Sequence, residues 1–435
     1  MSAADPTVDD LLAILERENL FLTGAAGTGK SWMTARIIEA YKAQERGVVA
    51  LGSTGVSAVN IGGLTVHSFF VLGISNSFED LREHDRRNKK RLSELKRLLK
   101  ATELIVIDEI SMIGPETLEM IRYRLESLGY TGRVMFVGDF YQLPPVVQPG
   151  ASPAAGLFGE AVYAFESGAW AALAPRVVEL REMKRTRDAA FTRILSLIRQ
   201  GERSREVTDY LLALCNNDKV LGESPTWLYG RNREVEGMNR ESLARLEGEE
   251  YLFFAELEKE KGLHEKRLES WIRLLPVSEA LHLKVGAPVL FTVNRWGRYV
   301  NGERGILRAV EEEFLIVEKD GEFVRVEPHE FILGEPVVDE NGRVEMRPLA
   351  TLKQFPLRLA YAVTIHKSQG MSIDRLVCNV DTLFVPSQFY VAVSRATDPR
   401  GLRIEFGRGD LERYLERVIR VDPRVRKYYE SIGGA

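Results

Sequence analysis

The sequence predicts an α/β protein whose parallel sheets are covered by helices on both faces. In the first third of the chain, short and nearly continuous apolar runs alternate with amphipathic stretches, as buried strands and their connecting helices do. The same alternation begins again near residue 176. Between residues 276 and 350 it gives way to short β-rich segments separated by Asn-Gly and Asp-Gly turns, which are hairpin signals.

The composition is that of a soluble globular protein. Apolar residues make up 45% and charged residues 28% of the 435 residues. A chain of this length is expected to form about three domains. The formal net charge of −4 leaves no overall basic field, so a nucleic-acid partner would have to be held by local basic patches.

The sequence gives no indication of a membrane or secretory segment. The stretch MSAADPTVDD at the start is acidic and lacks an apolar signal region, and no apolar run approaches the ~20 residues of a membrane span. Cys215 and Cys378 lie far apart and lack metal-ligand spacing, so we expect buried thiols in a reducing compartment. These features predict a soluble, cytoplasmic protein without a membrane partner.

The strongest local signal is the run LFLTGAAGTGKS at residues 20–31. It consists of an apolar strand, a loop that fits G-x-x-x-x-G-K-[ST] and the start of a helix. Glycines let successive backbone N–H groups point at one anion, and the helix N-terminus adds its positive end. The expected nucleotide-binding residues are Gly24, Gly27, Thr28, Gly29, Lys30 and Ser31.

Lys30 would reach the β- and γ-phosphates of a nucleoside triphosphate, and the Ser31 hydroxyl would bind Mg²⁺. The alternative is a chance match in a flexible loop, which the flanking strand and helix disfavour. ATP and Mg²⁺ are therefore the expected ligands.

The remaining elements of the first unit follow in order. An amphipathic helix is expected from residue 31 to Gly47, which ends it, and Pro115 suits the first position of a later helix. Buried strands are expected at residues 48–54, 103–109 and 133–139.

A highly charged stretch occupies residues 79–100. Leu92, Leu95 and Leu99 follow helical spacing, which favours a solvated amphipathic helix. The alternative is a basic surface that meets phosphates through Arg86, Arg87, Lys89 and Lys90.

The second unit is expected to begin with a strand at residues 177–181, followed by a helix. A charged stretch at residues 255–270 is expected to be solvated, and the unit resumes after the β-rich segment. The predicted domains are residues 1–175, residues 176–275 together with 351–435, and a small inserted β-barrel at 276–350.

Asp108 and Glu109 close an apolar strand downstream of the phosphate loop. A carboxylate at that end of a parallel strand is suited to bind Mg²⁺ through water, which we assign to Asp108. Glu109 would orient and deprotonate the attacking water. The alternative, an exposed strand end that happens to be acidic, is disfavoured by the phosphate loop upstream.

Gln142 lies in a tight loop stiffened by Pro144 and Pro145, and it could reach the γ-phosphate or its water. Turn chemistry alone would also explain this loop.

Arg185 and Arg395 are suited to bidentate phosphate contact, although any single arginine is more often a surface residue. Two α/β units with one phosphate loop suggest a single ATP site between the units.

Six sequence runs in order carry a resemblance to a known family. Besides the phosphate loop, they are STGVSAVNIGGLTVHSFF (53–70), DEISMIG (108–114), GDFYQLPPV (138–146), AYAVTIHKSQGMSID (360–374) and FYVAVSRATDPRGL (389–402). Together they resemble the helicase motifs of the PIF family, the superfamily 1 DNA helicases related to the bacterial RecD type. The runs HKSQG and VAVSRAT are the most specific of the set.

The resemblance implies two RecA-like P-loop domains with ATP between them, a wedge insertion at about residues 63–78, and an inserted Src-homology-type barrel. It implies a Mg²⁺- and ATP-dependent helicase that moves 5′ to 3′ on single-stranded DNA and opens duplex junctions. Many family members also resolve G-quadruplexes and RNA–DNA hybrids. We expect a monomer on DNA.

When the family's roles are assigned to the matching positions, the resemblance implies the same roles as those argued above for Lys30, Ser31, Asp108, Glu109 and Gln142. It adds Arg185 as the motif IV arginine, Arg395 as the arginine finger and Gly370 as the glycine near the γ-phosphate. The sequence departs from the family twice. Residues 1–23 lack the glutamine that reads adenine, which leaves ATP selectivity open, and motif IV has KRT where an apolar-Arg-Gln run is usual.

The resemblance also implies DNA contacts by Thr54, Gly55, Val56, His67, Ser68, Phe69, His366, Lys367 and Ser368. Lys367 is the expected contact to the phosphate backbone. A structural, hydrogen-bonded role is the alternative for both histidines. Phe69 and Phe70 could stack on a base or form a wedge, and we favour a core position for one of the pair.

A further DNA contact is predicted from composition alone. Trp296, Arg298 and Tyr299 interleave aromatic and basic groups in a hairpin loop, which suits stacking on a single strand. A hairpin that packs its own aromatic side chains would look the same in sequence.

Two functions remain open from the sequence. One is a helicase that unwinds duplex DNA, and the other is a DNA-stimulated translocase that remodels protein–DNA complexes without processive unwinding. A P-loop ATPase that acts on a small molecule or a protein is disfavoured by the HKSQG and VAVSRAT runs. The polarity of movement comes from the resemblance and from no residue chemistry.

Overall fold

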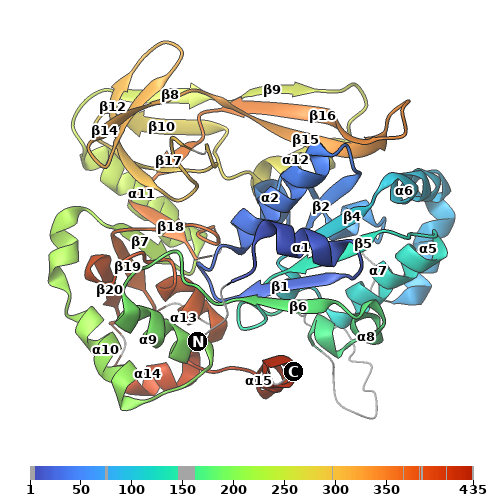
Figure 1. Ribbon diagram of the computed structural model, residues 1–435. Coiled ribbons are helices and arrows are strands. Elements are labelled where there is room, and N and C mark those ends of the chain that lie inside the picture. The colour runs from blue at the N-terminus through green and yellow to red at the C-terminus, as the bar shows by residue number, and fades with distance from the viewer. Residues whose placement is uncertain are drawn as a thin grey trace. The chain divides into compact units, whose positions relative to one another are not determined.

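The computed structural model describes residues 5–73, 77–145, 162–295, 297–365, 367–381, 383, 386–407 and 409–433. The chain divides into two compact units, whose elements are labelled in Figure 1. Unit 1 comprises Met1–Glu182, Gly334–Pro348 and Pro423–Ala435, and unit 2 comprises Met183–Leu333 and Leu349–Asp422. In the described ranges, no helix combines the length and the apolar composition needed to cross a membrane.

Unit 1 is built on a six-stranded sheet whose recorded pairings are all parallel. Its strands lie in the order β3 (Leu64–Thr65), β2 (Val48–Gly52), β4 (Leu104–Asp108), β5 (Arg133–Val137), β1 (Leu20–Gly24) and β6 (Arg176–Leu180). β1 lies between β5 and β6, and all of its residues are buried. This interior position explains why the strand before the phosphate loop is apolar.

The described helices of unit 1 surround this sheet. They are α1 (Val8–Leu15), α2 (Lys30–Ala43), α3 (Gly55–Asn60), α4 (Val66–Phe69), α5 (Phe78–Arg87), α6 (Lys89–Ala101), α7 (Pro115–Ser127), α8 (Gly168–Leu173) and α15 (Pro423–Gly433), with the 3₁₀ turns η1 (Ile110–Met112) and η2 (Ala164–Glu166). The strands predicted before residue 140 and the helices after the phosphate loop and at Pro115 are confirmed, whereas the charged stretch at 79–100 forms two helices that are separated at Asn88.

Both faces of the unit 1 sheet are covered, as expected for buried parallel strands. Leu20 and Leu22 of β1 belong to one apolar cluster with residues of α1 and α2. Phe21, which points to the opposite face, contacts Trp170 of α8 with ring centroids 5.2 Å apart. The apolar residues of β1 therefore contribute to the hydrophobic core on both faces of the sheet.

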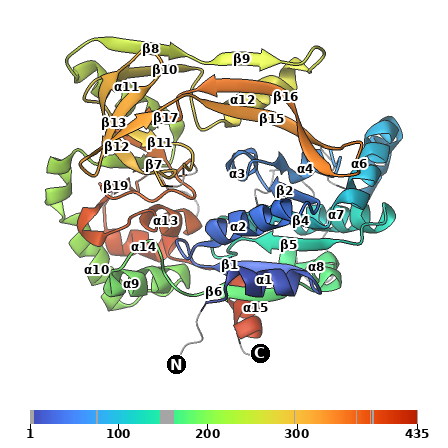
Figure 2. The same cartoon turned by 45° about the horizontal axis from the view of Figure 1, so that its top comes forward.

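The limits of the two units differ from those expected. The strand predicted to open the second unit is β6, which pairs with β1 along its whole length and completes the sheet of unit 1. The C-terminal residues from Pro423 were assigned to the second domain by sequence, whereas α15 belongs to unit 1. Figure 2 shows α15, in red, below β6 and α8. Neither the pairing of β6 with β1 nor the place of α15 in unit 1 can be predicted from sequence patterns, because both join residues far apart in the chain.

The α/β part of unit 2 has a four-stranded parallel sheet. Its strands lie in the order β18 (Ala362–Thr364), β7 (Thr226–Tyr229), β19 (Leu376–Asn379) and β20 (Leu402–Glu405). The described helices of unit 2 are α9 (Ala189–Arg199), α10 (Arg205–Cys215), α11 (Asn232–Arg245), α12 (Glu265–Leu274), α13 (Pro386–Val393) and α14 (Leu411–Val418), with η3 (Asp218–Glu223) and η4 (Pro399–Gly401). The chain thus has two parallel sheets, as the sequence predicts.

The β-rich segment forms an antiparallel five-stranded sheet together with β17, which lies beyond the predicted end at residue 350. The strand order is β14 (Glu322–Val326), β13 (Leu315–Lys319), β12 (Arg304–Val310), β11 (Pro288–Phe291) and β17 (Leu357–Leu359). A buried cluster that includes Phe291, Leu307, Val317 and Phe355 forms its core. The strand pairings of the described residues end at β14 and β17, so closure into a barrel stays a prediction.

The remaining described strands form two further sheets. β8 (Glu250–Phe254) pairs with β10 (Ala280–Lys284), and β15 (His329–Val338), β16 (Val344–Gln354) and β9 (Glu256–Lys259) form a third sheet. The charged stretch at 255–270 is therefore partly ordered, because it contains β9 and the first part of α12. All four residues of β9 are exposed, which agrees with the expected solvation.

Candidate nucleotide and DNA sites

The phosphate loop joins β1 to α2 and requires glycine at two positions. A Cβ added to Gly24 would lie 2.5 Å from the Leu180 carbonyl oxygen and 2.9 Å from Thr28 Oγ1. Gly29 caps α2 with φ at 96°, a left-handed conformation. Because glycine has no side chain, the residue that caps α2 cannot itself bond to the N–H groups of the first turn, and a helix N-terminus of this kind suits an anion.

Lys30 lies folded over this loop. Its Nζ donates to the carbonyl oxygens of Gly24 and Ala25 at 2.7 and 3.0 Å. Thr28 Oγ1 donates to the same Ala25 oxygen at 2.9 Å, which tightens the turn. Ser31 follows on the first turn of α2 and is exposed. The loop therefore places an ammonium, a hydroxyl and a helix N-terminus around one small volume, as phosphates and Mg²⁺ require.

The carboxylates of Asp108 and Glu109 lie at the carboxyl end of β4, as predicted. Burial and the neighbouring Glu109 carboxylate raise the pKa of Asp108, and the positive charge of Lys30 opposes that shift. Glu109 has φ at 53° and ψ at 49°, a left-handed conformation that is costly for a residue with a Cβ. Backbone strain of this kind concentrates at functional sites, and it turns the chain directly after the strand.

Gln142 lies in the loop after β5 and is 8% exposed. Its Nε2 donates to Asp139 Oδ2 at 3.5 Å, and its backbone N–H donates to the Asp139 carbonyl oxygen at 2.9 Å. Asp139 is fully buried and also accepts from the Tyr141 N–H at 3.1 Å. The glutamine is therefore anchored to a buried aspartate that the sequence analysis did not select.

Arg185 and Arg395 come together in unit 2 although 210 positions separate them in sequence. Arg185 Nη1 donates to the Ser394 carbonyl oxygen at 2.7 Å, and Arg395 Nη2 donates to the Ser394 hydroxyl at 3.1 Å. Burial and the adjacent charge of Arg395 lower the pKa of Arg185 to about 9. Two neighbouring guanidinium groups with reduced solvation favour the approach of an anion.

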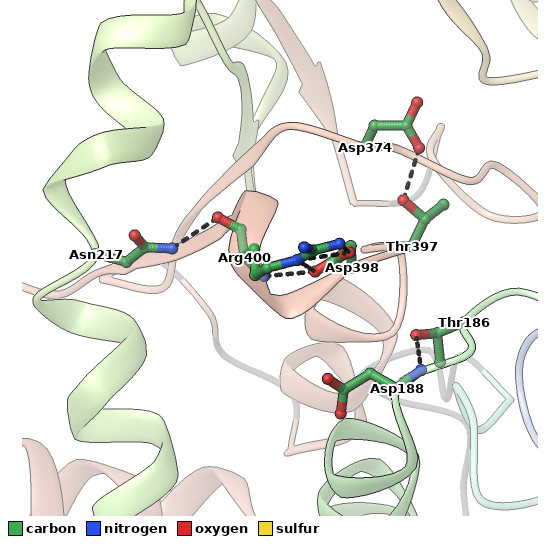
Figure 3. Close-up of polar contacts among 7 residues, drawn as sticks. All are labelled: Thr186, Asp188, Asn217, Asp374, Thr397, Asp398 and Arg400. Carbon is green, nitrogen blue, oxygen red and sulfur yellow. Dashed lines mark hydrogen bonds and ion pairs between the residues drawn. The ribbon is translucent and has the colours of Figure 1, made fainter.

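The segments beside both arginines are held by side-chain contacts, which Figure 3 shows. Thr397 Oγ1 donates to Asp374 Oδ1 at 2.6 Å, and Asn217 Nδ2 donates to the Arg400 carbonyl oxygen at 3.0 Å. Next to Arg185, Thr186 Oγ1 accepts from the Asp188 N–H at 3.2 Å. These contacts restrain the backbone that follows each of the two arginines.

The predicted DNA contacts of unit 1 divide by exposure. Thr54, Gly55 and Val56 are partly exposed at the start of α3, where Thr54 caps the helix, and His67 is exposed on α4. Ser68 is half-buried, and its N–H donates to Thr65 Oγ1 at 3.3 Å.

Several predicted DNA contacts are buried. Phe69 is 4% exposed and Phe70 is fully buried, with their rings 4.9 Å apart, so both phenylalanines belong to the core and not just one. Tyr299 is 4% exposed and stacks on Phe291 at 4.2 Å, which makes it a core residue of the β-rich segment. Ser368 is fully buried, and its hydroxyl donates to the Ile365 carbonyl oxygen at 2.8 Å. Trp296 and His366 lie outside the described residues.

Lys367 is exposed and lines a pocket of about 560 Å³ in unit 2. Asn239, Arg240, Thr364 and Arg358 also line this pocket. Partial loss of hydration and the charge of Arg358 lower the pKa of Lys367, and the Glu236 carboxylate, which also lines the cavity, opposes that shift. Arg358 and Arg240 could not be predicted, because an arginine inside a strand or helix has no motif of its own. Gly370, also predicted, is exposed with φ at 78°.

A strand–glycine loop–helix with its lysine, together with an acidic pair at the carboxyl end of β4 in the same sheet, defines a P-loop nucleoside triphosphatase. A family model described as PIF1-like helicase matches residues 7–214. The ATP-dependent DNA helicase Pif1 of Campylobacter jejuni is 40% identical over 97% of this chain and 97% of that protein. The human ATP-dependent DNA helicase PIF1 is 31% identical over 97% of this chain and 62% of the human protein. The chain belongs to the PIF1-like helicase family.

Solved structures agree with this assignment. The structure of a Bacteroides Pif1 in complex with ADP-AlF4 has a TM-score of 0.82 and 26% identity, and the match covers 98% of this chain and 96% of that one. The structure of Bacteroides Pif1 bound to single-stranded DNA has a TM-score of 0.62 and 25% identity, covering 99% of this chain and 97% of that one.

Proposed function

We propose that this protein is an ATP-dependent DNA helicase that moves 5′ to 3′ along single-stranded DNA and opens duplex at a junction. The observation that carries this proposal is the phosphate loop with Lys30 beside Asp108 and Glu109, in a chain of the PIF1-like helicase family. The relatives named above are ATP-dependent DNA helicases, and one solved relative is bound to single-stranded DNA. Action as a monomer, and on G-quadruplexes or RNA–DNA hybrids, are further parts of the proposal.

The hydrolytic chemistry follows from the residues of unit 1. Lys30 and the first-turn N–H groups of α2 bind the phosphates, and Glu109 takes the proton of the attacking water. Gln142 positions that water or the γ-phosphate. Mg²⁺, bound by Ser31 and Asp108, would neutralise the charge that builds up on the phosphate oxygens. The glycine cradle and the Lys30–Asp108 proximity fit such an ion and its nucleotide.

Arg185 and Arg395 complete the reaction in this proposal. A guanidinium at the γ-phosphate stabilises the charge of the transition state. After the phosphate leaves, the guanidinium would no longer be attracted to the nucleotide site. The predicted DNA contacts, which include residues 54–56 and Lys367, would then switch between two arrangements as the nucleotide binds and is released. Support for the role of unit 2 comes from the convergence of both arginines on Ser394.

Lys367→Ala should weaken single-stranded DNA binding about equally for all sequences and reduce the salt slope of log K by about 0.7. The reason is that Lys367 and Arg358 bring positive charge to one cavity, so contact with phosphate is expected to dominate over contact with bases. Fluorescence anisotropy with unrelated oligonucleotides over a range of salt concentrations measures both quantities. Lys219→Ala, an exposed lysine of the same unit outside that cavity, is the control. An unchanged salt slope would remove Lys367 from the interface.

The decisive experiment for the proposed function is strand separation on partial duplexes with either a 5′ or a 3′ single-stranded tail. We expect unwinding with ATP and Mg²⁺ on the 5′-tailed substrate and little on the 3′-tailed one. Unwinding of the 3′-tailed substrate alone would contradict the polarity. DNA-stimulated hydrolysis without unwinding of either substrate would instead establish a translocase that remodels protein–DNA complexes.

A further inference from the structure

The C-terminal helix α15 contacts the nucleotide site of unit 1 through one tyrosine. The hydroxyl of Tyr429 lies 2.7 Å from Thr23 Oγ1, accepts from the Phe140 N–H at 3.2 Å and donates to Asp139 Oδ1 at 3.4 Å. Thr23 precedes Gly24, and Asp139 is the buried residue that anchors Gln142. A residue near the end of the chain thus touches two segments that flank the phosphate site.

The surroundings of Tyr429 restrict its position. Its ring stacks on Tyr141 with centroids 4.6 Å apart and planes 16° apart. The preceding Tyr428 stacks on Phe165 at 4.3 Å and contacts Phe140 at 5.6 Å. Thr23 and Asp139 are both fully buried, so their polar groups need partners inside the protein. The tyrosine hydroxyl is one of those partners for each.

We propose that Tyr429 is a positioning residue for ATP hydrolysis, whose hydroxyl links the end of β1 to the loop that carries Gln142. β1 and β5 are neighbours in the sheet, and their recorded pairing ends at Leu22 and Val137, so it does not extend to Thr23 or Asp139. The hydroxyl bridges the segments immediately before the phosphate loop and immediately after β5. It thereby fixes the distance between the phosphate cradle and the glutamine side chain. This inference deepens the proposed function and rests on it.

Tyr429→Phe tests the link because it removes the hydroxyl and retains the stacking on Tyr141. We expect kcat for DNA-stimulated ATP hydrolysis to fall about tenfold, with KM for ATP and DNA affinity unchanged, since a hydrogen bond that positions a reacting group acts mainly in the transition state. Tyr428→Phe removes a hydroxyl from the same helix and should keep the wild-type kcat. Thermal unfolding of both variants reports any general loss of stability.

A double-mutant comparison distinguishes a positioning role of Tyr429 from a general structural effect of its substitution. If Tyr429 acts through the glutamine, Tyr429→Phe should lower kcat much less in a Gln142→Ala background than in the wild type. A wild-type kcat for Tyr429→Phe, or a fall that multiplies fully with Gln142→Ala, would overturn the positioning role while leaving the proposed function intact. Absence of DNA-stimulated hydrolysis by the wild-type protein would overturn both.

Discussion

Lys30→Ala should lower the rate of ATP hydrolysis about 10³-fold or more, while the variant still binds single-stranded DNA. The ammonium of Lys30 is held over the phosphate loop by the Gly24 and Ala25 carbonyl oxygens, 2.7 and 3.0 Å away. A phosphate can replace these weak carbonyl partners and gain a charge-assisted hydrogen bond. Alanine removes the only side-chain cation of the G-x-x-x-x-G-K-[ST] run, and the backbone N–H groups remain.

Phosphate release with and without single-stranded DNA measures the loss, and fluorescence anisotropy measures DNA binding. Lys42→Ala is a matched control, because Lys42 is an exposed lysine on the same helix α2. It should hydrolyse ATP at the wild-type rate. Hydrolysis by Lys30→Ala at the rate of this control would exclude the phosphate loop as the catalytic site.

Arg395→Ala should bind ATP with nearly wild-type affinity and hydrolyse it about 10³-fold more slowly. A guanidinium that stabilises transition-state charge changes kcat far more than KM. Arg395 is 2% exposed, and its Nε donates to the Val391 carbonyl oxygen at 2.8 Å. Truncation therefore also removes a buried hydrogen bond, and thermal unfolding must accompany the kinetics.

Two further variants make the result specific. Arg395→Lys keeps the charge and loses the planar fork, so we expect a partial recovery of kcat relative to the alanine variant. Arg400→Ala, five positions along, removes an arginine whose side chain is 90% exposed and pairs with Asp398, and it should leave hydrolysis unchanged. Normal turnover by a folded Arg395→Ala protein would show that the arginine finger is a different residue.

The nucleotide site could be predicted from sequence because its parts are local. Gly24 to Ser31 form one strand–loop–helix, and Asp108 and Glu109 end one apolar strand. In such segments the spacing of glycines, the apolar run and the charged residue after it already specify the backbone path. Parallel pairing of β1, β5 and β4 then brings their carboxyl ends to one edge of the sheet.

The residues that are buried against expectation show what a sequence pattern leaves open. Phe69 and Tyr299 have the composition of DNA-stacking residues, yet each is buried against another aromatic ring. An aromatic side chain suits a core and a base equally well, so only its neighbours decide between them. The partner of β6 and the place of α15 could not be predicted because both join residues far apart in the chain.

The sequence by itself determined the fold class, the family and the phosphate-binding chemistry, since each resides in short runs whose residue types and spacing permit few alternatives. The tertiary structure alone decided which aromatic residues are core and that Arg185 meets Arg395 at Ser394. It also decided that Tyr429 reaches Thr23 and Asp139 from the end of the chain. Such contacts arise when burial of apolar surface draws distant elements together, and no local pattern records which elements will meet.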